Sequence, residues 1–211
     1  MYKAILFDLW GTLADFRLPE LENLAQAART SIGMERWSIV RQHFLDWHRA
    51  DYHHAAFLKK LLSDINLNDD EITLVTAWIT YDEFTLFPET MEMLSWLKDH
   101  RIKLGLVTNS PPTSYQHFMN FGLNIYFDAL SFSFKLGYLK PGKEIFDDAI
   151  EKLDVERSSV VMVGDSIDKD MEGAQNAGID GLLIDREGTK DYPHKIRNLR
   201  ELKTLLREKE Q

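Results

Sequence analysis

Three short apolar segments of this chain each end at a residue whose side chain could take part in chemistry. The residues that follow them are Asp8, Thr108 and, one glycine further, Asp165. If the segments are neighbouring parallel strands, their carboxyl ends lie at one edge of a sheet and these side chains converge there. Two close carboxylates repel each other, and a hard divalent cation such as Mg²⁺ relieves that repulsion without protonation. The spacing therefore predicts a magnesium site where Asp8 and Asp165 meet.

Two further features indicate a site for an anionic substrate. Lys140 stands directly before Pro141 and shortly before a helical pattern. An ammonium group in such a position can hold a phosphate or a carboxylate as a point charge. Thr108, Asn109 and the serine after them offer hydroxyl, amide and backbone N–H donors directly after a strand, which makes this segment a candidate oxyanion cradle.

The elements that must position these residues alternate along the chain. Apolar segments without polar alternation are typical of parallel strands that are covered on both faces, and amphipathic helical patterns lie between them. This order predicts an α/β fold with a doubly wound, Rossmann-like parallel sheet. The predicted strands are 3–7, 104–107, 129–134, 160–163 and 181–184, and one of the predicted helices spans 171–177.

The segment between the first two predicted strands has a different pattern. Its hydrophobic residues recur at helical spacing and predict four helices. An insertion after the carboxyl end of a strand lies over the crevice in which open α/β sheets bind ligands. We therefore predict an α/β core made of residues 1–14 and 84–211 and a helical cap made of residues 15–83.

Composition excludes several classes of partner. The chain has 211 residues, no cysteine and a formal net charge of -9. A negative field repels phosphodiester backbones, so we expect no nucleic-acid partner. No apolar run approaches the ~20 residues that span a bilayer, and the first residues are too short and too quickly acidic to be a secretory signal. We expect a cytoplasmic protein without a membrane partner, and the sequence leaves its oligomeric state open.

Four segments, in this order, resemble the motifs of the haloacid dehalogenase-like hydrolase superfamily. They are FDLWGTL (7–13), LVTNS (106–110), LKPGKEIF (139–146) and VGDSIDKDMEGAQNAG (163–178). The helical insertion after the first motif is similar to the helical-cap subgroup, which holds many small-molecule phosphatases and the 2-haloacid dehalogenases. The resemblance implies a Mg²⁺-dependent hydrolase, and we favour a phosphatase that acts on a small phosphorylated metabolite.

The resemblance also implies roles for matching positions in the reaction. Asp8 would be the nucleophile and would form a covalent aspartyl intermediate that water then hydrolyses. Lys140 would neutralise charge on the nucleophile and the phosphoryl group. Thr108 and the backbone of Asn109 would hold the anionic group of the substrate.

Other matching positions would hold the metal or shape the site. Asp165 would ligate Mg²⁺ together with Asp8, and Asp170 would support the site through a water or a hydrogen bond. Gly11 and Thr12 would shape the turn after the nucleophile and take part in binding the substrate.

The first motif departs from the pattern of the family's phosphatases. Those phosphatases resemble D-x-D, and their second Asp protonates the leaving alkoxide, whereas this chain has Trp10 at that position. The indole N–H is a donor that does not titrate, and general acid–base help is typically worth about 10²–10⁴ in rate. Trp10 can still offer its backbone carbonyl to the metal. We therefore expect slow hydrolysis of an ordinary sugar phosphate unless another group supplies the proton.

One interpretation keeps the phosphatase and changes either the acid or the substrate. The acid would come from a histidine of the cap, or the substrate would have a good leaving group, as in an acyl phosphate or an aryl phosphate. The candidate histidines are His43, His48, His53 and His54.

Two other interpretations stay open. In a 2-haloacid dehalogenase-type hydrolase the halide leaves without protonation, but the acidic fourth motif would place negative charge beside a carboxylate substrate. In a catalytically weak binding or regulatory protein of the same fold, cap aromatics would form the binding surface, although their helical spacing favours a role in the cap's own core. These aromatics are Trp37, Phe44, Trp47, Tyr52 and Phe57.

Overall fold

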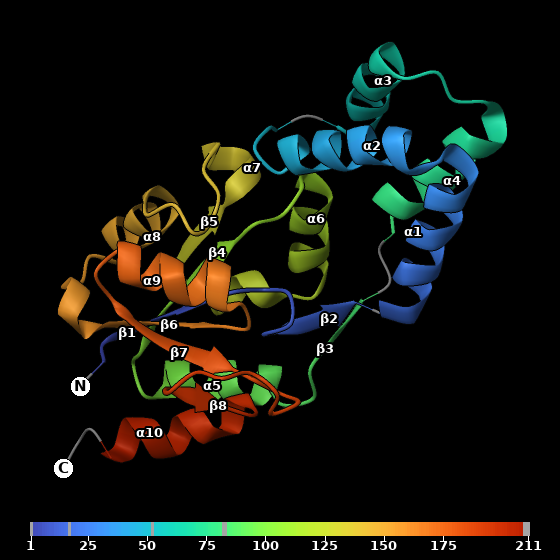
Figure 1. Cartoon of the computed structure of the whole chain (residues 1–211). Coiled ribbons are helices and arrows are strands. Elements are labelled where there is room, and N and C mark those ends of the chain that lie inside the picture. The colour runs from blue at the N-terminus through green and yellow to red at the C-terminus, as the bar shows by residue number, and fades with distance from the viewer. Residues whose placement is uncertain (1, 17, 52, 82–83, 209–211) are drawn as a thin grey trace.

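A parallel sheet of six strands forms the centre of the core (Figure 1). The computed structural model describes residues 2–16, 18–51, 53–81 and 84–208. The strands of the sheet are β1 (Ala4–Phe7), β4 (Lys103–Thr108), β5 (Ala129–Phe132), β6 (Val160–Gly164), β7 (Asp180–Ile184) and β8 (Lys195–Ile196). Their order is β5-β4-β1-β6-β7-β8, and each neighbouring pair is parallel.

Helices cover both faces of this sheet, which explains why its strands lack polar alternation (Figure 1). One face carries α5 (Thr90–Asp99), α6 (Pro112–Asn120) and α10 (Leu202–Glu208), and the other carries α8 (Glu144–Leu153) and α9 (Glu172–Asn176). In β1, Ile5 and Phe7 pack into the first hydrophobic cluster and Ala4 and Leu6 into the second, and all four side chains are fully buried. The predicted doubly wound α/β fold is confirmed.

The order of the strands places three of their carboxyl ends side by side. From β1 the sheet extends through β4 and β5 in one direction and through β6 and β7 in the other, so β1 marks the switch in topology. Open α/β sheets bind ligands in the crevice at such a switch. Asp8 follows β1, Thr108 ends β4, and Asp165 follows β6. All three positions therefore belong to this crevice.

Four helices form the predicted cap, and its helical character is confirmed. They are α1 (Leu18–Ile32), α2 (Met34–Trp47), α3 (His54–Asp64) and α4 (Asp69–Ile79). The helices pack around a hydrophobic core of their own, in which Trp47, Phe57 and Leu61 are fully buried. Arg36 of α2 also binds the carboxylate of Glu71 at the start of α4 at 2.8 Å, which fixes these two helices together.

A two-stranded antiparallel ribbon joins the cap to the core. Strand β2 (Ala14–Phe16) leads into the cap, strand β3 (Phe84–Leu86) leads out of it, and Ala14 lies opposite Leu86. The sequence did not predict this ribbon, because three residues are too few to show a period-2 pattern. The cap was predicted to span residues 15–83, and residue 83 lies outside the described residues, so these domain boundaries stay a prediction.

The helical backbone after β6 begins earlier than the sequence pattern indicates. We predicted a helix over 171–177, but a π-helical turn, η3 (Ile167–Met171), precedes α9. The earlier start places Asp170 within the turn, where its carboxylate accepts a hydrogen bond from the N–H of Ser166 at 2.9 Å. The remaining short helices are α7 (Ser133–Leu136), η1 (Leu123–Ile125), η2 (Arg157–Ser159) and η4 (Leu199–Glu201).

No helix in the described part of the chain combines the length and the apolar character that crossing a membrane requires.

Candidate active site

Three carboxylates meet at the carboxyl ends of the central strands. Asp8, Asp165 and Asp170 each offer an oxygen atom, and these oxygens lie within 4.8 Å of one another. The structure therefore brings Asp8 and Asp165 together, as their positions after β1 and β6 predict. Asp170 joins them because the π-helical turn carries it back toward the end of β6.

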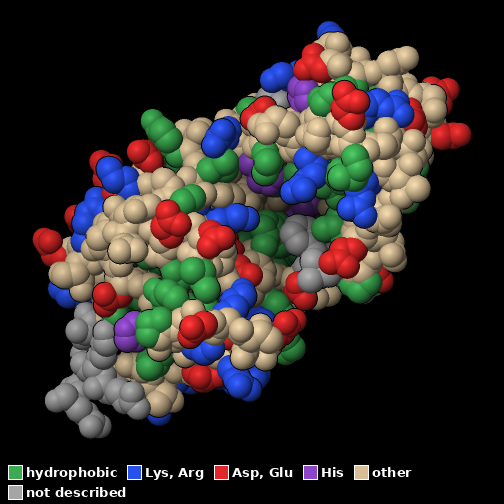
Figure 2. Space-filling model, viewed as in Figure 1, with side chains coloured by type: hydrophobic (Ala, Val, Ile, Leu, Met, Phe, Trp, Pro, Cys, Tyr) green, Lys and Arg blue, Asp and Glu red, His purple; other side chains and the backbone are tan. Residues whose placement is uncertain are grey.

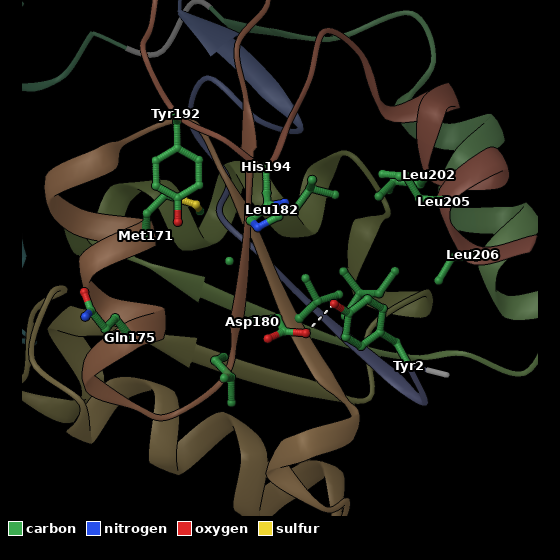
Figure 3. Close-up of a pocket in the computed structure, with 14 residues that line it drawn as sticks. Tyr2, Met171, Gln175, Asp180, Leu182, Tyr192, His194, Leu202, Leu205 and Leu206 are labelled. Carbon is green, nitrogen blue, oxygen red and sulfur yellow. Dashed lines mark hydrogen bonds between the residues drawn. The ribbon is translucent and has the colours of Figure 1, made fainter. Parts of the chain in front are cut away.

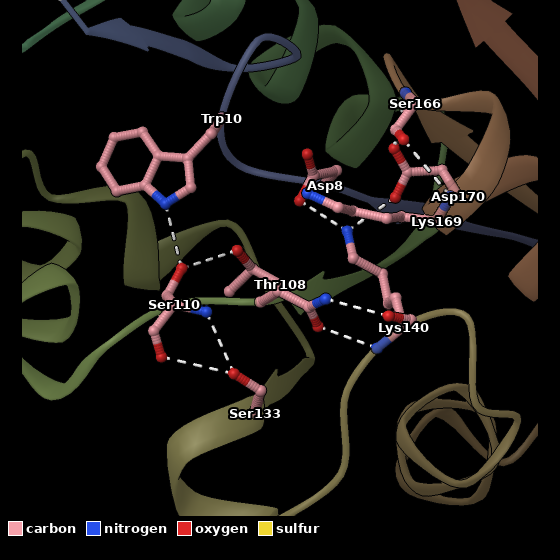
Figure 4. A network of polar contacts seen from close by, with 10 residues as sticks. Asp8, Trp10, Thr108, Ser110, Ser133, Lys140, Ser166, Lys169 and Asp170 are labelled. Atoms are coloured by element: carbon pink, nitrogen blue, oxygen red, sulfur yellow. Dashed lines mark hydrogen bonds and ion pairs between the residues drawn. The ribbon is translucent and has the colours of Figure 1, made fainter. Parts of the chain in front are cut away.

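Lys140 is the buried cation of this cluster. Its Nζ atom donates to Asp8 Oδ1 at 2.7 Å and to Asp170 Oδ1 at 2.6 Å, and only 5% of the residue is exposed (Figure 4). The side-chain amide of Asn109 fixes the backbone of this lysine, because Nδ2 donates to the Lys140 carbonyl at 3.0 Å and Oδ1 accepts from its N–H at 2.8 Å. Sequence reasoning assigned the backbone of Asn109 to the substrate and did not find this contact.

Burial dominates the electrostatics of the cluster. It raises the pKa of the Asp8 carboxyl to about 7, although the ammonium group of Lys140 acts in the opposite direction. Burial and the neighbouring charge of Asp170 also raise the pKa of Asp165. Burial acts to lower the pKa of Lys140, but the carboxylates of Asp170 and Asp8 outweigh it and raise that pKa, so the lysine stays charged. The single ammonium group of Lys140 therefore cannot neutralise the three carboxylates of the cluster when all of them are ionised.

The surroundings of the carboxylates fit a divalent cation. Three carboxylate oxygens form the hard donor set that Mg²⁺ prefers. Two glycines give these carboxylates room: a Cβ atom at Gly11 would lie 2.7 Å from Asp165 Oδ2, and one at Gly164 would lie 2.4 Å from Asp170 Oδ2. Lys190 also approaches Asp165, with Nζ 3.7 Å from Oδ2, at the outer side of the cluster. The predicted metal contact of the Trp10 carbonyl stays a prediction.

A chain of hydroxyl groups connects Trp10 to Thr108. The Trp10 Nε1–H donates to Ser110 Oγ at 3.0 Å, and Ser110 Oγ lies 2.8 Å from Thr108 Oγ1 (Figure 4). Because the indole is only a donor, Ser110 Oγ must accept there, and its own proton can go to Thr108. When Ser110 donates in this way, the Thr108 proton points away from Ser110. Ser110 is completely buried, and sequence reasoning gave it no role of its own.

Arg186 holds the turn that follows Asp8. Its guanidinium group donates to the backbone carbonyls of Gly11 at 3.3 Å and Thr12 at 2.7 Å, and it pairs with Glu89 at 2.7 Å. Gly11 has a φ of 75°, which a side chain would strain. Thr12 is completely buried, and its Oγ1 atom has no hydrogen-bond partner among the described residues. Both residues thus lie in this turn, and their predicted part in the site stays a prediction.

Replacing Arg186 with methionine is expected to destabilise the protein by about 3 kcal/mol, because Glu89 is buried and would lose its ion-pair partner. Equilibrium unfolding in urea measures this change. Arg200→Met is the matched control: Arg200 pairs with Glu92 in an ion pair whose side chains are 54% and 48% exposed, so its loss should cost less than about 1 kcal/mol. Equal losses in the two variants would contradict the anchoring role of Arg186.

The four candidate histidines of the cap have different surroundings. His43 Nε2 lies 2.8 Å from Asp64 Oδ2 within the cap, and His53 caps α3 by accepting from the N–H of Ala55 at 3.3 Å. The ring of His54 packs against that of His53 at 4.0 Å between centroids. Within the described residues, His48 is the one of the four that lines a pocket between cap and core.

That pocket has a volume of about 150 Å³ and includes Trp10 and Asn109 from the candidate site. The space-filling view shows a hollow between the two parts of the molecule, with histidine side chains in its wall (Figure 2). Phe44 and Trp78 of the cap and His117 of α6 also line the pocket. His117 was not among the predicted residues, since no pattern around it in the sequence points to the cap.

Most of the cap aromatics lie in the cap's own core, as their helical spacing favoured. Trp37, Trp47 and Phe57 belong to the buried core of the cap, whereas Phe44 is partly buried and faces the pocket. Tyr52 lies outside the described residues.

A larger cavity, of about 550 Å³, lies away from the carboxylates (Figure 3). Residues of β7, η3 and α10 line it, and Tyr2 and Asp180 form a hydrogen bond at its edge. None of the site residues named above takes part in its lining. The smaller pocket reaches the candidate site through Trp10 and Asn109, and Asn109 holds the backbone of Lys140.

A doubly wound sheet, a helical cap and a cluster of carboxylates around a buried lysine define a class of capped hydrolases. The model of the haloacid dehalogenase-like hydrolase family matches residues 2–178, and the chain belongs to that family.

Among its relatives is a glyceraldehyde 3-phosphate phosphatase of Methanothermobacter thermautotrophicus, which is 26% identical over 204 residues that cover 90% of this chain and 88% of the relative. A crystal structure of a HAD phosphatase from Thermococcus onnurineus is similar over 97% of both chains, with a TM-score of 0.69 and 29% identity. A 2-haloacid dehalogenase from Pseudomonas syringae pv. Tomato DC3000 has a TM-score of 0.74 over 99% of both chains; at 23% identity this likeness concerns the fold alone.

Proposed function

We propose that this protein is a Mg²⁺-dependent phosphatase that acts on a small phosphorylated molecule through a phosphorylated Asp8. The observation that carries the proposal is the buried Asp8 carboxylate, held at 2.7 Å by Lys140 and joined by the oxygens of Asp165 and Asp170 within 4.8 Å. The phosphatases among its relatives support the same class of reaction.

The proposed reaction has two displacements at phosphorus. Lys140 binds Oδ1 of Asp8, which leaves Oδ2 to attack the phosphorus atom while the bond to the leaving oxygen breaks. Water then attacks the phosphorus of the aspartyl phosphate, which releases inorganic phosphate and restores the carboxylate. Thr108 donates its hydroxyl proton to a phosphoryl oxygen, and Lys140 stabilises the charge that develops.

The metal is part of this proposal. Asp8 and Asp165 would hold Mg²⁺, and Asp170, which binds Lys140 and the N–H of Ser166, would keep both partners in place. A bound Mg²⁺ supplies charge stabilisation to the transferring phosphoryl group. Three carboxylates can accommodate a phosphate when a divalent cation lies between them and the phosphate. Without a metal, the carboxylate of a haloacid would be repelled by the negative charge of the site. We therefore favour the phosphatase over the dehalogenase.

Trp10 predicts a strong dependence of rate on the leaving group. Acetyl phosphate or an aryl phosphate should be hydrolysed at least about 10²-fold faster than glyceraldehyde 3-phosphate, because only the alkoxide needs a proton as it leaves. Phosphate release from a panel of esters, plotted against the acidity of the leaving group, measures this dependence.

Two variants at the same position control this experiment. Trp10→Asp should reduce the difference in rate between acyl and alkyl phosphates, because it introduces a group that can deliver a proton. Trp10→Asn should leave that difference in place, because asparagine is similar in size to aspartate but does not titrate. Equal rates for alkyl and acyl phosphates in the unmodified protein would show that another group, such as His117 in the pocket wall, already supplies the acid.

A further inference from the structure

The pocket between cap and core has an aromatic wall that comes from three separate parts of the chain. Trp10 of the core packs edge-on against Phe84 of the ribbon, with ring centroids 4.9 Å apart. Phe44 and Trp78 of the cap pack against each other at 4.6 Å. All four rings line the same pocket, so a ligand that enters it contacts aromatic surface on the core side and on the cap side.

The size of the pocket suits one aromatic ring. Its volume is about 150 Å³, and an apolar cavity of roughly this volume in another protein binds benzene. Offset and edge-on contacts with several rings also favour a planar aromatic ligand over an aliphatic one of the same area.

The polar side chains that line the pocket are uncharged or histidine: His48, Tyr81, Asn109, Thr113, Ser114 and His117. Its described lining contains no Lys, Arg, Asp or Glu side chain, so a second phosphate or a carboxylate on the substrate would have no charged partner there. Asn109 uses both ends of its side-chain amide on Lys140. The lining therefore offers a leaving group aromatic surface and uncharged hydrogen-bonding groups, but no ammonium, guanidinium or carboxylate partner.

His48 does not supply a proton for an alkoxide. Its Nδ1 atom lies 2.7 Å from the carbonyl oxygen of Phe44, and burial lowers the pKa of the ring. The neutral ring carries its single proton on Nδ1, where a carbonyl accepts it, so Nε2 is left as an acceptor. His48 therefore gives no help to a leaving group that must be protonated, and a leaving group that departs without a proton does not need such help.

We propose that the pocket selects substrates in which the phosphoryl group is attached to an aromatic leaving group, as in an aryl or aroyl phosphate. This substrate class rests on the proposed phosphatase function. The phosphoryl group would sit at Asp8 and Lys140, and the aromatic ring would lie between Trp10 and the cap residues Phe44 and Trp78.

Benzoyl phosphate and acetyl phosphate test the preference during turnover. Their leaving groups are carboxylates of similar acidity, so a difference in rate reports contact with the ring and not the missing acid. The value of kcat/KM should be about tenfold to hundredfold higher for benzoyl phosphate, which is the effect of burying a phenyl group. Equal values of kcat/KM for the two substrates would overturn the proposed aromatic preference without contradicting the phosphatase function.

Benzylphosphonate and ethylphosphonate test the same pocket without turnover. Both are non-hydrolysable, and in the presence of Mg²⁺ the unmodified protein should bind the benzyl compound at least about tenfold more tightly, as measured by calorimetry. If the protein shows this preference but hydrolyses no phosphate ester, the result would support the ring-binding pocket and contradict the phosphatase function. Equal affinities would overturn the ring-binding pocket.

Substitutions locate the preference within the pocket. Phe44→Leu keeps an apolar side chain and removes the ring, so the ratio of benzyl to ethyl affinity should fall to within about threefold, whereas Trp78→Phe should retain the preference. Tyr138→Ala is the matched control, because Tyr138 is 54% exposed and is not part of the pocket lining. If Phe44→Leu leaves the ratio of benzyl to ethyl affinity unchanged, the proposed position of the ligand's ring is contradicted.

Discussion

Replacing Asp8 with asparagine is expected to reduce phosphate release by about 10⁴-fold or more, because the amide cannot act as the nucleophile and nothing else at the end of β1 can take its place. The phosphorylated intermediate should disappear as well. Rapid quenching with a radiolabelled substrate, followed by detection of acid-stable label on the protein, measures both effects in one experiment.

The Asp8→Asn variant should remain folded, which separates this result from a loss of structure. Lys140 keeps its second partner, since Asp170 Oδ1 lies 2.6 Å from its Nζ atom. Burial disfavours the charge of Asp8, so removing that charge should not lower the free energy of unfolding. A folded variant that hydrolyses substrate at the full rate would exclude Asp8 as the nucleophile.

Chelation of Mg²⁺ is expected to lower phosphatase turnover by roughly 10³-fold, because a bound divalent cation stabilises the transferring group by several kcal/mol. Assays with EDTA, followed by addition of excess Mg²⁺, should show loss and recovery of activity. Asp165→Asn should raise the Mg²⁺ concentration needed for half-maximal activity, since it removes one of the three converging carboxylates.

The same treatment distinguishes the two hydrolase interpretations. Release of halide from a 2-haloacid that continues in EDTA, without any phosphate release, would support the dehalogenase. A protein that hydrolyses neither a broad panel of phosphate esters nor a haloacid, and yet retains a ligand tightly, would support the binding protein.

The sequence carries enough information to predict the fold and the meeting of the main side chains. Buried parallel strands appear as apolar runs that end at a polar residue, and the order of strands and helices then brings Asp8, Thr108 and Asp165 to one edge. Lys140 could be predicted to bind an anion from Pro141 and the helical pattern after it, but its role beside Asp8 came from the resemblance of this segment to the family's third motif.

The rest of the site depends on contacts between distant segments, which leave no local pattern. Arg186 reaches the Gly11 carbonyl across a separation of 175 residues, and Asn109 reaches Lys140 across 31. Phe84 belongs to a strand of three residues, and its ring lies beside that of Trp10 only because the chain returns from the cap at this point. Such contacts arise from tertiary packing, so residue type and spacing do not reveal them.

The ribbon that joins the cap to the core is also part of the pocket wall. The ring of Phe84 in β3 lies 4.9 Å from that of Trp10 and 4.9 Å from that of His117. Bending of this ribbon would move the cap relative to the core. It would therefore also change the width of the pocket beside Trp10. A substitution in this ribbon is therefore expected to alter both the placement of the cap and the wall of the pocket beside Trp10.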